Sequence, residues 1–449
     1  MAVRGRDGCF FFDPKRRCPF SYFFSWEGLI LQQSNSLEQR QTQRRGVFVG
    51  FASVIFMYWA AMAPLSYNTL LLQSSGFSSA EVGSIMAAFA AVGIIAPPIW
   101  GYIADRIGSA SKTFILVFGI QAVVIASLPL FGGIRLGGFV LLAIAMPMSN
   151  FVRNCSQNLL DAWTMQNTTR TGVPFGSVRL FGSLGWMVSC VGMSVLASKT
   201  DVSICFYLAG IFSVIVCAIA MRLNRRYPSK NTEDVMEKAV KAAKKINPFR
   251  LFKNYYFVVL LGYVLLSQMM FNCTTTFMPY LLEDLGIDPN FVGTVMGLRC
   301  IPEALLLFVG SRILRYVTLP KMMAGIGVLL AAEQICYNFA STPITIILIC
   351  MIGGVASGLY FSTTIEYAFR LAPPSLAASA QTFLGMATAI GMICSSLLGG
   401  FMVDAFGVLT FYTTAGLIIF TGFVLYVLSF PFASKVLKKP IPADLLRKG

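Results

Sequence analysis

Six charged side chains stand inside long apolar runs of this chain. They are Arg153, Asp161, Arg179, Arg299, Glu303 and Glu333, and Glu366 stands near the end of another run. At the centre of a membrane-spanning helix each such charge costs about 2.5–3.5 kcal/mol on an insertion scale. A carboxylate there can take up and release a proton, because burial favours its neutral form and a neighbouring Arg favours its charged form. An Arg can bind an anionic or hydroxyl-bearing ligand through its planar guanidinium.

Uncharged polar residues accompany these charges at helical spacing. One face carries three of them together with Asp161, at intervals of four, three and four residues: Asn150, Asn154, Gln157 and Asp161. Arg299 and Glu303 are four residues apart on a second helix, and Gln268 and Asn272 have the same spacing on a third. Residues at these intervals share one helix face, so the pattern predicts stripes that line a polar tunnel.

The pattern leads to two expected roles. Glu303, beside Arg299, is expected to carry a proton, and Asp161 with Arg179 is expected to orient a substrate. The residues expected to take part in proton coupling are Glu303, Arg299, Glu333 and Glu366. The residues expected to bind substrate are Asp161, Arg179, Arg153, Gln157, Tyr67, Asn68, Gln268 and Asn272.

Purely structural roles are the alternative for each of these groups. The charges can be buried ion pairs that hold helices together, although a buried pair rarely stabilises more than a hydrophobic pair does. Asn68, Gln268 and Asn272 can be interhelical hydrogen-bonding groups. Aromatic residues such as Trp59, Tyr337 and Tyr360 can stack on a ring-bearing substrate, or they can pack against other helices or anchor the protein at the membrane interface.

The composition shows what kind of element must position these side chains. Of the 449 residues 56% are hydrophobic and only 12% are charged, which excludes a disordered protein, a coiled coil and an ordinary cytosolic enzyme. A spanning helix needs about 20 apolar residues. Twelve such runs occur, at 47–73, 80–103, 113–131, 136–165, 174–198, 203–222, 254–281, 289–314, 320–340, 343–368, 376–403 and 409–433. The sequence therefore predicts an all-α membrane protein with twelve transmembrane helices.

The distribution of basic residues predicts the orientation of these helices. If both termini are cytoplasmic, the inner segments hold 30 of the 35 Lys and Arg residues, and the outer loops hold only Arg135 and Lys199. This asymmetry follows the positive-inside rule. It explains the net charge of +16 as a topology signal and an attraction to anionic lipid, so nucleic acid is not an expected partner.

A weak repeat indicates two pseudo-symmetric halves. GFSSAEVGSIMA begins at Gly76 and GIDPNFVGTVMG begins at Gly286, an offset of 210 residues. At that offset Gly93 corresponds to Glu303 and Phe89 to Arg299, so only the second half carries charge there. The expected organisation is a partly disordered cytoplasmic tail, a six-helix bundle, a cytoplasmic linker, a second six-helix bundle and a tail, at 1–46, 47–222, 223–253, 254–433 and 434–449.

Three motifs carry a resemblance to a known family. GYIADRIG, which follows the second run, is similar to the GxxADRxG loop of the major facilitator superfamily, and LLDAWTMQ followed by FGSVRLFGSLGW resembles its proton-coupled permeases for phenylpropionate, oligosaccharides and nucleosides. IPEALLLFVGSRILR, with Glu303 and Arg315, fits the same group. The resemblance implies a gating loop formed by Gly101, Asp105, Arg106 and Gly108. We also expect Asp105 to cap the next helix and to pair with a neighbouring Arg.

The resemblance implies a secondary active transporter of the cytoplasmic membrane that works by alternating access. The expected substrate is a small polar or anionic solute (a sugar, nucleoside or aromatic acid), carried with protons by a functional monomer; drug or metabolite efflux by antiport is the alternative. Sugar permeases of this group use a histidine for coupling, and this chain has none. Without histidine or a CxxC pair, no metal, cofactor or disulfide framework is expected.

Overall fold

The computed structural model describes residues 21–136, 139–229, 247–313, 316–373 and 376–446. Helices make up nearly all of this part of the chain. In the first half they are α1 Ser21–Met62, α2 Asn68–Ser74, α3 Ser79–Ile107, α4 Ala110–Ser127, α5 Leu142–Arg153, α6 Ser156–Thr171, α7 Phe175–Ala197 and α8 Ser203–Arg226. In the second half they are α10 Tyr255–Asp284, α11 Val292–Ile313, α12 Leu319–Cys336, α13 Pro343–Leu371, α14 Ala377–Phe406, α15 Val408–Lys435 and α16 Ala443–Leu446.

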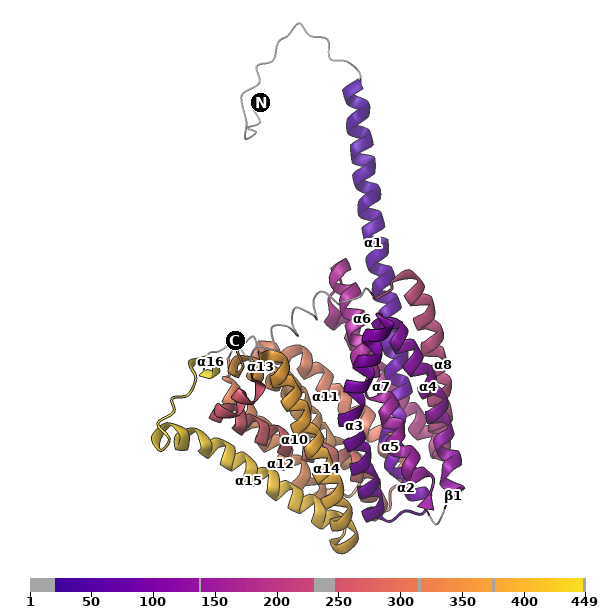
Figure 1. Cartoon of the computed structure of the whole chain (residues 1–449). Helices are drawn as coiled ribbons and strands as arrows, with labels where there is room; N and C mark the ends of the chain where they lie inside the picture. The colour runs from indigo at the N-terminus through magenta and orange to yellow at the C-terminus, as the bar shows by residue number, and fades with distance from the viewer. Residues whose placement is uncertain (1–20, 137–138, 230–246, 314–315, 374–375, 447–449) are drawn as a thin grey trace.

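Ten helices of the described chain are long and apolar enough to cross a membrane. The helices of the two halves gather separately, from indigo to magenta on one side of Figure 1 and from orange to yellow on the other. Short 3₁₀ turns extend or join them: η1 Ala63–Tyr67, η2 Leu128–Gly133, η3 Pro248–Lys253, η4 Pro289–Phe291 and η5 Tyr337–Phe339.

The continuous helix expected over 136–165 is wrong in two respects. A small antiparallel hairpin, β1 Arg135–Leu136 and β2 Phe139–Val140, precedes the helix, so the described chain is not strictly all-α. The helix itself is interrupted between α5 and α6. The hydroxyl of Ser156 donates a hydrogen bond of 2.7 Å to the carbonyl of Arg153 at this break, and such local bonds compete with the helical ladder.

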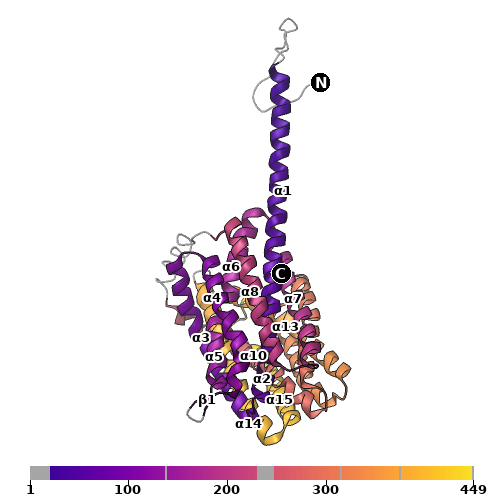
Figure 2. The same cartoon turned by 90° about the vertical axis from the view of Figure 1, so that its right-hand side faces the viewer.

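The described segments outside the two bundles contain helices. α1 begins at Ser21, so the expected tail 1–46 is helical from that residue onward, and Figures 1 and 2 show this part of α1 extending beyond the bundle. Residues 1–20 and residues 230–246 of the expected linker lie outside the described residues. Near the C-terminus, α16 contacts α12 and α13, and Leu445 is fully buried.

The repeat marks equivalent turns in the two halves. Gly76 has a φ of +88° and Gly286 a φ of +69°, a left-handed conformation that glycine adopts without steric cost. Each turn is followed by an N-capping side chain, from Ser78 before α3 and from Asp288 before η4. The two segments therefore share a backbone structure although few of their side chains are identical.

The halves meet along two seams, α3 with α14 and α7 with α11, and these seams are closed at one end only. On α3 the face that includes Gly83 is buried as far as Ala90 (5% exposed), whereas Ile94 on the same face is 38% exposed. On α14 Ser396 is 1% exposed and Met386 is 44% exposed. We call the end near Gly83 the closed end. At the opposite, open end lie α16 and the part of α1 that extends beyond the bundle (Figure 1).

Candidate substrate and proton site

Arg299 forms an ion pair inside the second half, but with a carboxylate other than the expected one. Its Nη1 atom lies 3.0 Å from Oε1 of Glu333, on α12. The hydroxyl of Tyr337 donates a second hydrogen bond to the same oxygen, at 3.2 Å. Glu333 is fully buried and Arg299 is 7% exposed. Among the described residues, Oε2 of Glu333 has no hydrogen-bond partner, so one carboxylate oxygen stays unsatisfied.

Two adjacent glycines of α13 make room for this pair. A Cβ atom on Gly353 would lie 2.1–2.2 Å from the carboxylate atoms of Glu333. A Cβ atom on Gly354 would lie 2.3 Å from the carbonyl oxygen of Arg299. Because any larger side chain would displace α11 or the Glu333 carboxylate, the sequence of α13 is part of the site.

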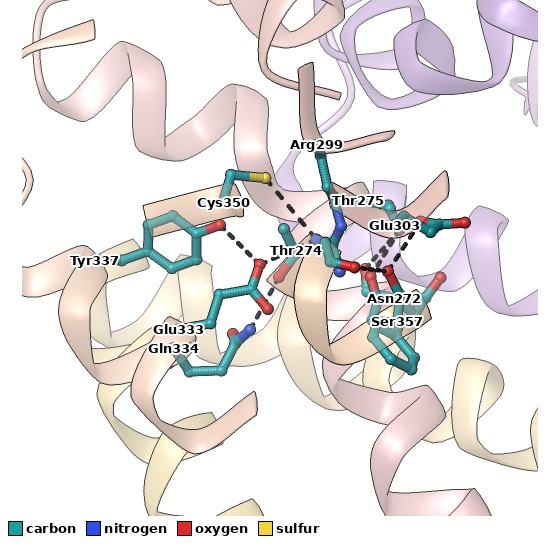
Figure 3. Close-up of polar contacts among 12 residues, drawn as sticks. Asn272, Thr274, Thr275, Arg299, Glu303, Glu333, Gln334, Tyr337, Cys350 and Ser357 are labelled. Carbon is teal, nitrogen blue, oxygen red and sulfur yellow. Dashed lines mark hydrogen bonds and ion pairs between the residues drawn. The ribbon is translucent and has the colours of Figure 1, made fainter. Parts of the chain in front are cut away.

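Glu303 lies on the other side of Arg299 and has different partners (Figure 3). Its Oε2 atom accepts a hydrogen bond of 2.9 Å from the hydroxyl of Ser357. The charges of Arg299 and of Arg179, which belongs to the other half, both act on its carboxylate. Arg299 therefore stands between two carboxylates and pairs with Glu333, whereas Glu303, the carboxylate expected beside it, is hydrogen-bonded to α13.

Arg179 projects from α7 and stacks on an aromatic ring. Its guanidinium carbon lies 4.6 Å from the centre of the Trp59 ring, within the range of a cation–π interaction. Trp59 in turn contacts Trp186 edge to face, with ring centres 5.9 Å apart. The stack fixes the plane of the guanidinium, so Arg179 can present a preorganised fork of donors to a ligand.

The stack depends on Gly182, one turn along α7. A Cβ atom there would lie 2.5 Å from Nη1 of Arg179 and 2.5 Å from Cδ1 of Trp59. We expect Gly182→Ala to weaken substrate binding on the order of tenfold, because the guanidinium must leave its position on the ring. Isothermal titration would measure this. Gly192→Ala is the matched control, because a Cβ atom at Gly192 meets nothing within 4 Å; equal affinities of the two variants would contradict the prediction.

Asp161 lies on α6 and forms no ion pair with Arg179 among the described residues. The side chain of Gln157 and the charge of Arg179 both act on its carboxylate, so the two charges are near each other without direct contact. In the described chain the charge of Arg179 thus acts on Asp161 without an ion pair between the two side chains. A ligand that bridges Asp161 and Arg179 would satisfy both groups.

The remaining polar stripe on α5 supports a neighbouring helix. Asn150 donates a hydrogen bond of 2.6 Å to the carbonyl of Phe89, and Asn154 donates one to the carbonyl of Gly93, both on α3. Arg153 donates a hydrogen bond of 2.7 Å to Asn150, and its guanidinium lies 5.2 Å from the Phe89 ring. These contacts fix α5 against α3, so the structure engages Arg153 in helix packing.

The polar residues of α10 and of the first span contact mainly other helices. Asn272 donates hydrogen bonds to both Ser395 and Ser396 of α14, at 2.7 and 2.9 Å. Gln268 reaches the hydroxyl of Tyr360 at 3.5 Å. Tyr67 is fully buried, and Asn68 beside it is 5% exposed. Tyr67 donates a hydrogen bond to the carbonyl of Cys190 and fills the space at Gly293.

Glu366 lies apart from the other carboxylates. It pairs with Arg370, one turn further along α13, at 2.8 Å, and its side chain is 44% exposed. An exposed pair of this kind contributes little to stability. Glu366 is thus on the surface of the structure and not among the enclosed charges around Arg299.

The expected gating loop forms the end of α3, with one correction. Gly108 ends the helix in a left-handed conformation, and Arg106 stacks on the Tyr102 ring at 5.0 Å. Gly101 and Asp105 are exposed. The N-cap of α4 is Ser109, whose side chain accepts the amide hydrogen of Lys112, so the expected capping by Asp105 is wrong. Asp105 lies too early in the chain, because α3 continues to Ile107.

Sequence reasoning did not identify three residues that shape the site. Ser357 binds Glu303, Gly353 accommodates Glu333, and Gly182 accommodates Arg179. Small residues in membrane helices mark close packing in general. The sequence offered the pair Gly353–Gly354 and the glycines around Arg179 as signals, but it did not show which side chain each of them accommodates.

Comparison with known proteins adds a family match. The sequence model of the MFS_1 like family matches residues 49–414 of this chain. The maltose permease of Geobacillus stearothermophilus is 24% identical over 363 residues, covering 80% of this chain and 88% of the permease. The xanthosine permease of Escherichia coli (strain K12) is 23% identical over 362 residues, covering 77% of this chain and 84% of that permease.

A solved structure has a similar fold. The crystal structure of the nucleoside transporter NupG superimposes with a TM-score of 0.71 at 14% sequence identity. The superposition covers 86% of this chain and 99% of the transporter. At this identity the likeness concerns the path of the chain and the arrangement of its helices, not the side chains of the site.

Proposed function

Because the chain belongs to the MFS_1 like family, we propose that it carries a small polar organic solute across a membrane together with protons, by alternating access of one central site. The family match and the two permeases establish the general function: the chain is a multi-pass membrane transporter of the major facilitator superfamily and not an enzyme. Direction, coupling ion and solute are the parts that we propose.

The proposal includes a topology. We count the broken helix α5–α6 and the helix α11 with the ten apolar helices, which gives twelve spans with both termini in the cytoplasm. The excess of Lys and Arg in the segments at that side supports this orientation. We propose the cytoplasmic membrane, a functional monomer, bundles at 47–222 and 254–433, and segments 1–46, 223–253 and 434–449 on the cytoplasmic side. With this orientation the structure is open to the cytoplasm.

One observation carries the coupling mechanism: Arg299 stands between Glu333, with which it pairs at 3.0 Å, and Glu303, which accepts a hydrogen bond from Ser357 (Figure 3). In the state with both carboxylates charged, Arg299 and Arg179 compensate them. A proton bound by Glu303 removes one negative charge from the α7–α11 seam. Arg179 is then free to bind a substrate with Asp161, and release of the proton reverses the change.

Energy for accumulation would come from the inward movement of the proton. One positive charge that crosses 100 mV supplies about 2.3 kcal/mol. The rocking of the two halves about a central site is the general mode of such transporters. At the closed end, Gly83 and Gly293 allow the helix backbones of the two halves to approach closely. Because closely packed interfaces have discrete arrangements, each seam is either open or closed.

The site favours a hydroxyl-bearing solute. Arg179 presents donors, Asp161 presents acceptors, and the two are near each other but not paired, which suits a ligand that offers both acceptors and hydroxyl groups. The names of the two permease relatives point to maltose and xanthosine as the first compounds to test. Aromatic acids are the third class, because Trp59 stands beside the guanidinium.

We expect Asp161→Asn to weaken substrate binding by roughly tenfold, because a hydrogen bond to a charged acceptor contributes more than one to a neutral acceptor. Purified protein would be screened by thermal shift with maltose, xanthosine and an aromatic acid, and the best ligand would be titrated into wild type, Asp161→Asn and Arg179→Ala. Unchanged affinity in both variants would remove the Asp161–Arg179 region from the site.

Direction of transport decides between uptake and efflux. Proteoliposomes loaded at high internal pH and placed at lower external pH should accumulate labelled substrate if the transporter is a symporter. A proton-coupled antiporter would instead expel preloaded substrate under the same gradient. The second result would replace the symport proposal while leaving the assigned site in place.

A further inference from the structure

The two seams between the halves are related by the offset of the repeat. Gly83 of α3 packs against Gly400 of α14, where a Cβ atom on Gly83 would lie 2.9 Å from the Cα atom of Gly400. Gly293 of α11 packs against Cys190 of α7, where a Cβ atom on Gly293 would lie 2.5 Å from the Cys190 carbonyl oxygen. An offset of 210 residues converts the first contact into the second. The closed end therefore has two equivalent seams.

One turn beyond these contacts the two seams differ in charge. On the α3–α14 seam, Asp404 accepts hydrogen bonds from the amides of Ser79 and Ala80, at 3.2 and 3.0 Å, and from the hydroxyl of Ser79. The equivalent position on the α7–α11 seam is Ser194. It donates a hydrogen bond of 2.9 Å to the carbonyl of Asn290. A charged acceptor thus stands on one seam where the other has a neutral hydroxyl.

A third contact joins the two halves at the closed end. Gln73 of α2 donates a hydrogen bond to Glu283 of α10, and the two residues are themselves 210 positions apart. Residues that correspond under the repeat meet each other only near the pseudo-two-fold axis. A Glu at both positions would place like charges together, whereas the Gln supplies a donor. This contact is centred between the two seams.

Nearer the candidate substrate site, the charged residues are on α7 and α11 and not on α3 and α14. Glu303 of α11 and Arg179 of α7 correspond under the repeat to Gly93 of α3 and Ala389 of α14. The α3–α14 seam therefore carries its charged contact at the closed end and none of the equivalent charges at the centre. The carboxylate of Asp404 is matched to two amides that are free on this seam alone, because at the equivalent positions Pro289 has no N–H and the amide of Asn290 donates to Asp288.

We propose that Asp404 is a latch that holds the closed end shut and sets the balance between the inward-open and outward-open states. Its carboxylate compensates the two free amides and the positive end of the α3 dipole across the seam. When the seam opens, these groups must separate and be hydrated. Ser79 is 7% exposed, so its amide and hydroxyl depend on Asp404 while the seam is closed. The inference rests on the proposed alternating access, but on neither the substrate nor the proton.

Two native cysteines report on the two ends of the α7–α11 seam. Cys190 is fully buried at the closed end, and Cys300, on α11, is partly exposed towards the open end. Purified transporter without substrate would be treated with a thiol reagent, and the labelled Cys190 and Cys300 peptides would be quantified over time by mass spectrometry. In Asp404→Asn we expect Cys190 to react about fivefold faster and Cys300 more slowly, since an exposed charged hydrogen bond is lost.

The control is Asp284→Asn, which removes a charge from an exposed carboxylate at the same end of the molecule. Within the described chain, no hydrogen bond or ion pair joins Asp284 to the other half, so its labelling should match that of wild type. Ser194→Ala should have a smaller effect than Asp404→Asn, because it removes only neutral hydrogen bonds. Faster labelling of both cysteines would indicate loosening of the fold, and unchanged labelling would indicate no latch; either result would overturn the proposal. Failure of symport would leave these rates unaffected.

Discussion

Glu303→Gln is expected to abolish proton-driven accumulation while it preserves exchange of substrate across the membrane. A glutamine keeps the size of the side chain and can still accept the hydrogen bond from Ser357, at 2.9 Å in the native protein. It cannot take up and release a proton. Arg179 is then permanently free of the Glu303 charge, so the substrate site stays competent but transport is uncoupled from the proton gradient.

The expected effect is large because the whole driving force is lost. A potential of 100 mV supports accumulation of about 50-fold for one coupled charge. In proteoliposomes with an imposed potential of about 100 mV and equal pH on both sides, wild type should approach that ratio and Glu303→Gln should stop at equal concentrations. Counterflow of labelled against unlabelled substrate, measured in the same vesicles, should persist in the variant.

Glu366→Gln is the matched control for this experiment. The same chemical change then falls on a carboxylate that is half exposed and pairs with Arg370 on the surface of α13. We expect accumulation by Glu366→Gln to remain within about twofold of wild type, since exposed pairs contribute little. Full accumulation by Glu303→Gln would reject Glu303 as the proton carrier, and the next candidate would be Glu333.

The second large effect is expected from separating the buried pair of Arg299 and Glu333. Arg299→Met should destabilise the protein by about 3–5 kcal/mol, because it leaves the carboxylate of Glu333 buried without its positive partner. The double variant Arg299→Met with Glu333→Gln should regain most of that loss, since it removes both charges together. Thermal unfolding in detergent, followed by size-exclusion fluorescence, would measure the two shifts.

This comparison also separates a structural role of the pair from a coupling role. If the pair only holds α11 against α12, the double variant should be stable and should still accumulate substrate. If Arg299 relays the charge state of Glu303, the double variant should be stable but uncoupled. A double variant no more stable than Arg299→Met alone would contradict the buried-pair account, and Gly353→Ala, which places a Cβ atom on the carboxylate of Glu333, should resemble the single variant.

The sequence alone determined the class of the molecule and where its charges stand along the chain. Apolar length and basic loops suffice for this, because a bilayer requires spans of fixed length and penalises charge within them. The ten described helices that are long and apolar enough to cross a membrane all lie at expected runs. The break between α5 and α6 was missed because it spans only Asn154 and Cys155, and a reading of apolar length does not register so short an interruption.

The tertiary structure decided which charges meet. Spacing along one helix placed Arg299 beside Glu303, but the guanidinium turns to Glu333 on α12, from which it is separated by 34 residues in sequence. Periodicity describes a single helix, whereas a long Arg side chain chooses its partner among several helices by burial and by the space that small residues leave. Gly353 opens that space for Glu333, and the seams bring Arg179 near Glu303 and Asp404 onto α3. Such contacts arise from helix packing, and a single sequence does not encode them in any local pattern.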